Sequence, residues 1–345
     1  PIGGSSAVYP DWFGVKVSYT VPGHIIVDKV TNPAAHAQSF SFTTTGSGYS
    51  PFALTHAAAP NDQTLVPGNY SVAETAVGFW ESAAVCVSAT GDTETIGALE
   101  LDAGETITCT FTNTHRGDLV AVKTNNLGFG NAVYGTPFNW IITISNIEIG
   151  NVNISNAQDI LEDNLPTGAT YGTPTVVTAG GTTGTVNCAL VGNVVDCDAS
   201  GSVVVPPSGT ITVTIPVTPT AVGSLVNPTG GVCVADPDLV IAETIQGNNG
   251  CADTVTVDPK DQTITFGALA DKTYGDATFD VSATSDSSLT VAFAAAGDCS
   301  MFDADTVQID GAGSCTVTAS QAGNANYNAA TPVDQSFTVG AAALT

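Results

Sequence analysis

The chain has 345 residues, of which 43% are hydrophobic, and this length is enough for two or three domains of ordinary size. Only 6 Lys and Arg stand against 32 Asp and Glu, which gives a formal net charge of −26. Such acidity argues against binding to nucleic acid or anionic lipid and favours solubility outside the cell. No apolar run is long enough to cross a bilayer as a helix, so we expect no membrane insertion.

Short runs rich in Val, Ile and Thr recur about every ten residues between glycines and prolines, and no stretch has the 3.6-residue apolar period of a helix. The sequence therefore predicts an all-β chain of three tandem β-sandwich domains, arranged like beads on a string. We place these domains at residues 22–116, 117–258 and 259–345. Residues 1–21 precede them as an extension.

The extension contains an alternating stretch, residues 12–21, in which apolar side chains occupy every second position from Phe13 to Val21. This pattern is typical of a strand with one apolar face. The strand has no obvious sheet of its own. It either pairs with the first domain as an extra edge or enters the sheet of a neighbouring copy by strand addition.

Three polar residues of the first domain, Lys29, Glu74 and Asn113, have the parity of the apolar residues in their own strand runs. Because successive side chains of a strand point to opposite faces, this parity directs all three into the core. An amine, a carboxyl and a carboxamide in one apolar core are costly unless they react or pair. The set predicts an intramolecular isopeptide bond.

In this hypothesis the Lys29 amine attacks the Asn113 carboxamide, and Glu74 acts as the catalyst that passes a proton to the leaving ammonia. Burial assists the reaction because it disfavours the charged form of an amine and makes it a nucleophile. The alternative is a lysine whose stem is buried while its ammonium group reaches solvent.

Three segments of the first domain, residues 23–29, 67–74 and 104–113, resemble the prealbumin-like, collagen-adhesin B-type domains of bacterial surface proteins and pilins. The resemblance covers the whole domain. It implies a crosslink between a lysine of the first strand and an asparagine of the last strand, with the Glu of a Y-x-V-x-E motif as catalyst. Those roles fall on Lys29, Asn113 and Glu74.

The second domain is similar to a conserved repeat domain of large bacterial surface proteins, in segments 118–124, 135–138, 162–168 and 211–219. The resemblance implies an Ig-like sandwich. By position it also implies a second isopeptide set of the collagen-adhesin A type, with Lys123 and Asn227 as the joined residues and Asp163 as the catalyst. Two features depart from that pattern, since Lys123 lies in a run that is apolar on both faces and Asn227 precedes a proline.

The third domain resembles a bacterial Ig-like repeat in segments 262–266, 274–277 and 315–328. We expect no isopeptide set in it, because Lys272 follows Asp271 in a loop and is most simply a solvated charge. The linker to the second domain is predicted at residues 258–261.

The eight cysteines fall into four pairs of sequence neighbours, and none of them forms a CxxC motif or has histidines at zinc-ligand spacing. Disulfides are the default interpretation, and they predict an oxidising location outside the cytoplasm. Each bond is expected to stabilise its domain by about 2–4 kcal/mol. The expected pairs are Cys86 with Cys109, Cys188 with Cys197, Cys233 with Cys251, and Cys299 with Cys315.

The sequence lacks the common catalytic motifs, among them the G-x-S-x-G elbow, H-E-x-x-H, the P-loop and the dinucleotide fingerprint. We therefore expect no enzyme beyond the single-turnover crosslinking reaction, and no cofactor or metal. The carboxylates Asp303, Asp305 and Asp310 are a conceivable calcium cluster, but no loop has the EF-hand pattern.

These features favour a structural subunit of an extracellular filament or bacterial surface appendage, with copies of the same chain as partners. Two alternatives stay open: a stalk segment of a large adhesin, and a carbohydrate- or protein-binding module using Trp12 or Trp80. The sequence begins at Pro1 without a methionine or an apolar leader, as expected of a processed protein or of a piece of a longer one.

Overall fold

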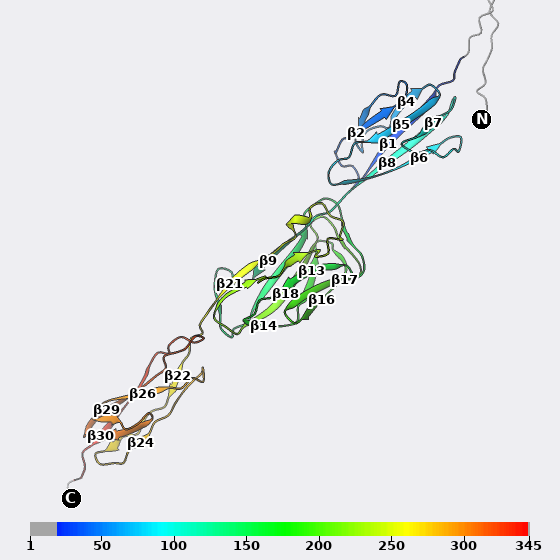
Figure 1. Ribbon diagram of the computed structural model, residues 1–345. Coiled ribbons are helices and arrows are strands. Elements are labelled where there is room, and N and C mark those ends of the chain that lie inside the picture. Colours follow the sequence, from blue (N-terminus) through cyan, green and yellow to red (C-terminus); the bar gives the residue numbers. More distant parts are fainter. Residues whose placement is uncertain (1–18, 344–345) are drawn as a thin grey trace, which may run out of the picture.

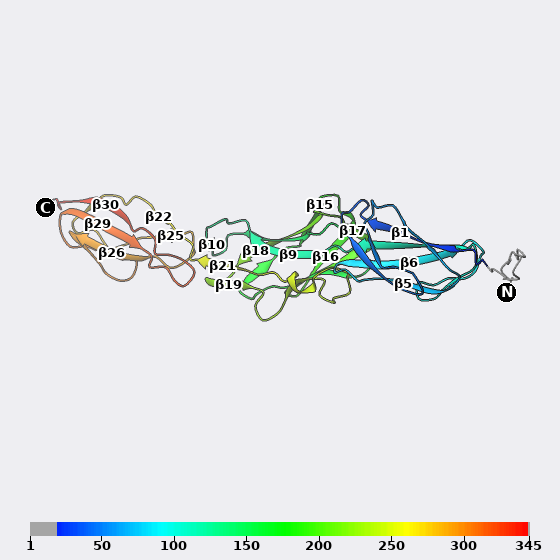
Figure 2. The ribbon, with the colours of Figure 1, turned by 90° about the horizontal axis from the view of Figure 1, so that it is seen from above.

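A computed structural model describes residues 19–343 of the chain. The regular secondary structure of these residues is β-strand, apart from a single turn of 3₁₀ helix, η1 (Gln246–Asn248), in the described part. The prediction of an all-β chain of tandem β-sandwiches is confirmed. Figures 1 and 2 show the three sets of strands following one another along an elongated molecule. Among the described residues no helix has the length and apolarity needed to span a membrane.

The first domain packs two antiparallel-rich sheets, ordered β4-β1-β8-β6 and β3-β2-β5-β7, around one apolar core. Within the first sheet, β1 and β8 are parallel neighbours, so the first and last strands of the domain lie side by side. Its strands are β1 (Gly23–Asn32), β2 (Phe40–Thr45), β3 (Phe52–Leu54), β4 (Asn61–Leu65), β5 (Gly68–Glu74), β6 (Trp80–Ser88), β7 (Leu99–Leu101) and β8 (Thr106–His115).

The second domain contains the largest core, which lies between the sheets β14-β18-β11-β9 and β12-β17-β13-β20 and extends to a third sheet, β10-β21-β19. β15 and β16 add to β18 and β17. Its strands are β9 (Leu119–Asn125), β10 (Ala132–Val133), β11 (Phe138–Asn146), β12 (Val152–Ile154), β13 (Asp159–Asn164), β14 (Ala169–Tyr171), β15 (Thr175–Ala179), β16 (Thr183–Val191), β17 (Val194–Val205), β18 (Thr210–Pro219), β19 (Gly223–Asn227), β20 (Cys233–Ala235) and β21 (Asp253–Asp258).

The third domain has shorter strands, in a sheet ordered β23-β30-β29-β26 and two smaller sheets, β22-β25 and β24-β28-β27. Several apolar residues beside its core are only partly buried. Its strands are β22 (Ile264–Phe266), β23 (Lys272–Thr273), β24 (Phe279–Asp280), β25 (Ala283–Ser285), β26 (Ala292–Gly297), β27 (Cys299–Met301), β28 (Thr306–Ile309), β29 (Gly313–Ser320) and β30 (Val333–Gly340).

The first and second domains meet in a tight junction. The Arg116 N–H donates to Phe79 O within the first domain, and the Thr244 N–H donates to Gly117 O within the second, both at 2.9 Å. Across the boundary, Thr244 Oγ1 donates to Arg116 O at 3.5 Å. At Gly150 the backbone passes so close that an added Cβ would lie 1.9 Å from His115 O. Only glycine fits there, so the sequence itself fixes how closely the two domains approach.

After the second domain, the linker residue Lys260 is held against the third domain, since its N–H donates to Asn326 O and its carbonyl accepts from the Asn328 N–H, both at 2.9 Å. The Tyr134 and Tyr327 rings pack edge to face across this junction, with centroids 5.5 Å apart.

The strand expected at residues 12–21 falls mostly outside the described residues. Its described end, residues 19–21, is exposed and forms no strand. Tyr19 and Val21 are 67% and 50% exposed. The apolar face of this stretch is therefore not covered by the first domain at these positions, and the expected extra edge strand is not found there.

Candidate intramolecular crosslink sites

The first candidate site joins the two sheets of the first domain. Lys29 on β1 and Asn113 on β8 come from the same sheet, and Glu74 at the end of β5 comes from the facing sheet. Lys29 and Asn113 are each 2% exposed, so the inward parity predicted from the sequence is confirmed. β1 and β8 are in register with Lys29 opposite Phe111, which places Asn113 one pleat further on the same face.

Within this site the Lys29 amine contacts both expected partners. Its Nζ donates a hydrogen bond to Asn113 Oδ1 and lies 3.1 Å from Glu74 Oε1. The other Glu74 oxygen accepts a hydrogen bond from Ser82 Oγ, while the buried Oε1 faces Lys29 Nζ and has no other hydrogen-bond partner among residues 19–343. That oxygen is therefore available to exchange a proton with the amine.

The walls of the first site are apolar. Lys29 Nζ lies 4.1 Å from the centroid of the Phe40 ring. Burial lowers the pKa of the Lys29 amine, and the hydrogen bond and charge of Glu74 oppose that shift only in part. The effect favours the neutral amine, which is the nucleophilic form. The alternative of an ammonium group reaching solvent is wrong, because the Lys29 side chain is 0% exposed.

The second candidate site lies in the second domain and has the same three kinds of side chain. Lys123 on β9 donates to both carboxylate oxygens of Asp163 on β13, at 2.7 Å each. Asn227 at the end of β19 donates from Nδ2 to Asp163 Oδ2 at 3.3 Å. Asp163 and Asn227 are completely buried and Lys123 is 5% exposed. The structure thus brings together the three residues that the family resemblance selected.

Burial shifts both ionisable groups of the second site toward their neutral forms. Burial lowers the pKa of Lys123 to about 8, although the Asp163 charge opposes this shift. Burial also raises the pKa of the Asp163 carboxyl, again against the effect of the Lys123 charge. Asn227 Oδ1 is buried without a hydrogen-bond partner in the described part of the chain. An unsatisfied carbonyl beside an amine and a carboxyl can accept an attack at its carbon.

The third domain has no equivalent set. Its buried polar side chains, within residues 259–343, are those of Gln262 and Ser285, and Ser285 Oγ donates to Gln262 Oε1 at 2.7 Å. Lys272 belongs to the short strand β23 rather than to a loop, and its amine lies 4.4 Å from the centroid of the Phe279 ring. The expectation of a simply solvated lysine is therefore wrong in detail.

Four disulfides are present, and they join the pairs that are neighbours in the sequence. Cys86–Cys109 connects β6 to β8 beside the first site, and Cys188–Cys197 connects β16 to β17. Cys233–Cys251 and Cys299–Cys315 close loops in the second and third domains. No free cysteine occurs in the described chain.

Sequence reasoning missed two groups of carboxylates in the second domain. Asp159, Asp196 and Asp198 bring one oxygen each within 4.8 Å of one another; a hydrogen bond shared with Asp198 raises the pKa of Asp159. Exposed acidic clusters are common without a metal, and the cluster of Asp159, Asp196 and Asp198 gives no further sign of binding one.

The carboxylates Asp303, Asp305 and Asp310 of the third domain were a conceivable calcium cluster. They form no such group in the part of the chain that the structure describes.

The other missed group centres on Glu243, in the loop after β20. Its carboxylate accepts hydrogen bonds from the Leu119 N–H at 2.7 Å and from Asn249 Nδ2. Glu243 is 5% exposed, and burial raises its pKa to about 7. The group anchors the loop to the first residue of β9. It has no periodic signal in the sequence, because a loop residue has no strand parity.

One family model matches the first domain. Residues 25–115 match the family model described as a prealbumin-like fold domain. The first domain has a prealbumin-like fold. The match covers one of the three domains, and no curated protein matches the chain.

Several solved structures are similar to the chain over most of its length. The major pilin subunit BcpA of Bacillus cereus has a TM-score of 0.38 at 11% identity, covering 94% of this chain and 98% of that one. The major pilin SpaD of Corynebacterium diphtheriae has a TM-score of 0.27 at 11% identity, with 80% and 74% covered. The major pilin SpaA of the same organism has a TM-score of 0.23 at 14% identity, with 91% and 83% covered. At these TM-scores the similarity does not by itself assign a function.

Proposed function

We propose that this protein is a structural subunit of an extracellular filament or surface appendage, strengthened by isopeptide bonds within its domains. The observation that carries the proposal is the pair of buried triads, Lys29 with Glu74 and Asn113, and Lys123 with Asp163 and Asn227. In each, the acid reaches across from the facing sheet to a lysine that it contacts directly.

At each site the neutral lysine Nζ attacks the side-chain carbonyl carbon of the asparagine. The new C–N bond forms as the bond to the asparagine Nδ2 breaks. One proton leaves the attacking amine, passes through the carboxyl group of Glu74 or Asp163, and reaches the departing nitrogen, which leaves as ammonia. No oxidant or cofactor is required, and no charge remains in the core. Each site reacts once and turns over nothing else.

A covalent role of this kind fits a molecule that has to stay folded outside the cell. The domains follow one another end to end (Figure 1), and disulfides close every domain. Disulfides persist in oxidising surroundings. The strong negative charge keeps the folded chain soluble there. We propose that copies of the chain associate head to tail, with the alternating segment 12–21 as a strand added to the next copy.

The test combines mass and imaging. The intact mass of the reduced native chain should fall short of the sequence mass by two ammonia molecules, one for each site. Electron microscopy of the native secreted protein should show filaments with a repeating subunit. A full sequence mass contradicts the crosslinks. Dispersed single rods at all concentrations contradict the subunit role and fit the stalk of an adhesin instead.

A further inference from the structure

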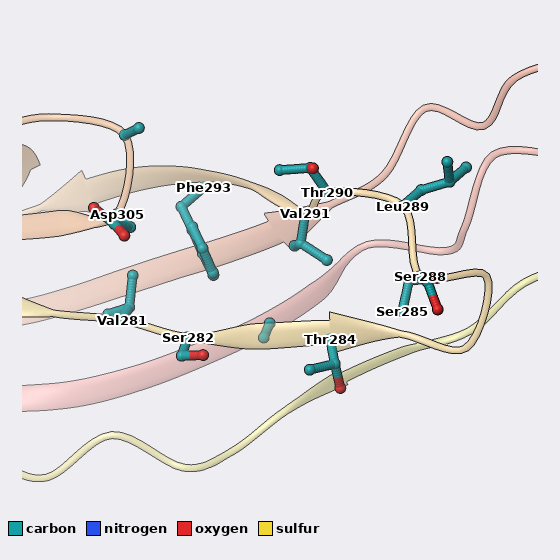
Figure 3. A pocket seen from close by; sticks show the side chains of 12 residues that line it. Val281, Ser282, Thr284, Ser285, Ser288, Leu289, Thr290, Val291, Phe293 and Asp305 are labelled. Carbon is teal, nitrogen blue, oxygen red and sulfur yellow. The ribbon is translucent and has the colours of Figure 1, made fainter.

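The third domain contains an open groove between β25 and β26, with a volume of about 490 Å³. Its apolar lining includes Val281, Ala283, Val291 and Phe293, and Asp305 lies at one end. Figure 3 shows the Val281, Val291 and Phe293 side chains directed into the space between the two strands. Except for Val281, these apolar residues are only partly buried, so the core of this domain is open along the groove.

Both strands that border the groove have a free edge. β25 pairs only with β22, and β26 pairs only with β29, among residues 19–343. The two strands are consecutive in the chain, yet they belong to different sheets. Each edge therefore offers a row of backbone N–H and C=O groups that a further strand can pair with.

The β26 edge lacks the features that usually block strand addition. Natural edge strands carry charged residues or proline, which prevent pairing with other chains. β26 has the sequence Ala-Phe-Ala-Ala-Ala-Gly, with neither a charge nor a proline. By contrast, the edge strands β4 and β6 of the first domain contain Asp62 and Glu81. The β26 edge is therefore suited to pairing rather than protected from it.

Residues 13–21 have the sequence properties of a strand that fits this groove. Phe13, Val15 and Val17 belong to one apolar face, and the opposite face is polar. Nine residues in extended form span roughly 30 Å, and the six residues of β26 span roughly 20 Å, so the segment can cover the whole edge. Lys16 lies on the polar face, so its charge stays in solvent when the apolar face is inserted.

The first and third domains lie at opposite ends of the molecule, with the second domain between them in both views (Figures 1 and 2). In the sequence the segment directly precedes β1 of the first domain, whereas the groove lies in the third domain. A chain cannot fill its own groove. The same geometry allows each copy to fill the groove of the next one in an open series.

We propose that residues 13–21 of one copy insert as a strand between β25 and β26 of a second copy, with Phe13, Val15 and Val17 against Val291 and Phe293. The inference rests on the proposed function and identifies the contact through which copies join. No covalent step is involved, because insertion buries apolar side chains and satisfies free backbone groups on both strands.

The donor side is tested with two variants of the full chain that differ by one position. Val17→Asp places a carboxylate on the inserted apolar face, and Ser18→Asp places the same charge on the polar face. Both residues precede β1, the first strand of the described domains, in the sequence. Sedimentation velocity should show that Val17→Asp abolishes association over the concentrations at which the native chain assembles, while Ser18→Asp keeps it.

The groove side is tested with Ala283→Phe, which fills the groove, against Ala294→Phe, which adds the same ring to the exposed face of β26. Ala283→Phe should be monomeric and Ala294→Phe should assemble. A mixture of Val17→Asp, with an intact groove, and Ala283→Phe, with an intact donor segment, should form heterodimers that do not grow further.

The outcomes separate this inference from the proposed function. Native chains that assemble, and whose assembly is unchanged by both Val17→Asp and Ala283→Phe, overturn the groove as the contact and leave the filament role standing. A mixture of those two variants that stays monomeric also overturns the groove. Native chains that never associate overturn both proposals.

Discussion

A lysine side chain can occupy a β-sandwich core in chemically different ways, and three lysines of this chain illustrate them. Lys29 lies against a carboxamide and an acid inside apolar walls. Lys123 forms a fully enclosed pair with Asp163. Lys272 is partly exposed and lies over an aromatic ring. Only the first two have a buried asparagine nearby, and only those two are expected to react.

At the first site, we expect Glu74→Gln to stop the reaction, because an amide cannot relay the proton. The reduced protein should gain the mass of one ammonia relative to the native chain, apart from the substitution itself. The first domain should lose about 4–5 kcal/mol of stability, since the bond closes a loop of 84 residues in the unfolded chain. The control Glu81→Gln removes an exposed carboxylate that pairs with Arg116. This variant should still lose both ammonia molecules, and its stability should change much less.

At the second site, Asp163→Asn should prevent the Lys123–Asn227 bond, so the ammonia that this bond would release stays in the protein. The expected mass gain is the same as for the first site, and the double variant with Glu74→Gln should regain both. Glu162→Gln on the opposite face of β13 is the matched control and should keep both bonds. Peptide mapping of the native chain should recover the segments around Lys123 and Asn227 as one branched peptide. Two separate linear peptides would show that this triad only pairs and does not react.

Glu243 predicts a pH dependence of the second domain. Its pKa is raised from 4.5 to about 7 in the folded chain, so between these values the native state keeps a proton that the unfolded state loses. Stability should therefore fall as pH rises from about 4.5 to 7, by up to about 3 kcal/mol, and level off above that. Calorimetry of Glu243→Gln should show this slope removed. Parallel pH curves for the two proteins would contradict the assignment.

The two triads and the Glu243 group differ in how far the sequence reveals them. Lys29, Glu74 and Asn113 lie within alternating runs, so strand parity alone locates them. Lys123 follows the run 119–122, which is apolar at every position, and Asp163 lies between two polar residues. Neither pattern reveals which face the side chain takes, so only family resemblance selects them. Glu243 lies in a loop that folds back onto β9, and no local pattern predicts a contact between residues so far apart.

At the level of elements, the central feature of the first domain is the parallel pairing of β1 with β8. These strands are the first and last of the domain, and the proposed bond joins them. The disulfide Cys86–Cys109 then joins β8 to the edge strand β6. The proposed bond and the disulfide together would tie three adjacent strands of one sheet, and the edge strand would be tied covalently by the disulfide alone.

We expect a double substitution, Cys86→Ala with Cys109→Ala, to loosen the edge strand selectively. Hydrogen exchange should become faster in β6, while β1 and β8 stay protected because the isopeptide bond still joins them. The domain should lose about 2–4 kcal/mol. Equal loss of protection in all three strands would show that β1 and β8 have no tie of their own.

Element type was predictable because the alternation of Val, Ile and Thr is regular throughout the chain. The pairing partner of each strand was less predictable from the sequence. The sequence shows that residues 12–21 suit a strand, but it does not show which edge is open to receive it. That information arises only when β25 and β26 enter different sheets and leave a groove between them.

At the scale of the whole molecule, the junction at Gly150 determines how the first two domains are placed. A side chain there would overlap His115 O, so Gly150→Ala should force the domains apart or rotate them. Small-angle scattering should report a changed particle shape, with both ammonia losses intact by mass. An unchanged scattering curve would show that the junction yields locally.

The parallel arrangement of β1 and β8 also governs how far the protein stretches under tension. A pull along the chain enters the first domain at β1 and leaves at the end of β8, and the proposed bond connects Lys29 to Asn113 directly. The two residues are 84 positions apart, and the chain between them would reach roughly 280 Å if fully extended. Because the bond would carry the force instead, this part of the chain would not come under tension. In the second domain the proposed bond would shield the residues between Lys123 and Asn227 in the same way, and the disulfide Cys233–Cys251 would shield part of the segment that follows. The third domain, in which only the Cys299–Cys315 disulfide closes a loop, could lengthen most, and it would act as the main elastic element of each subunit.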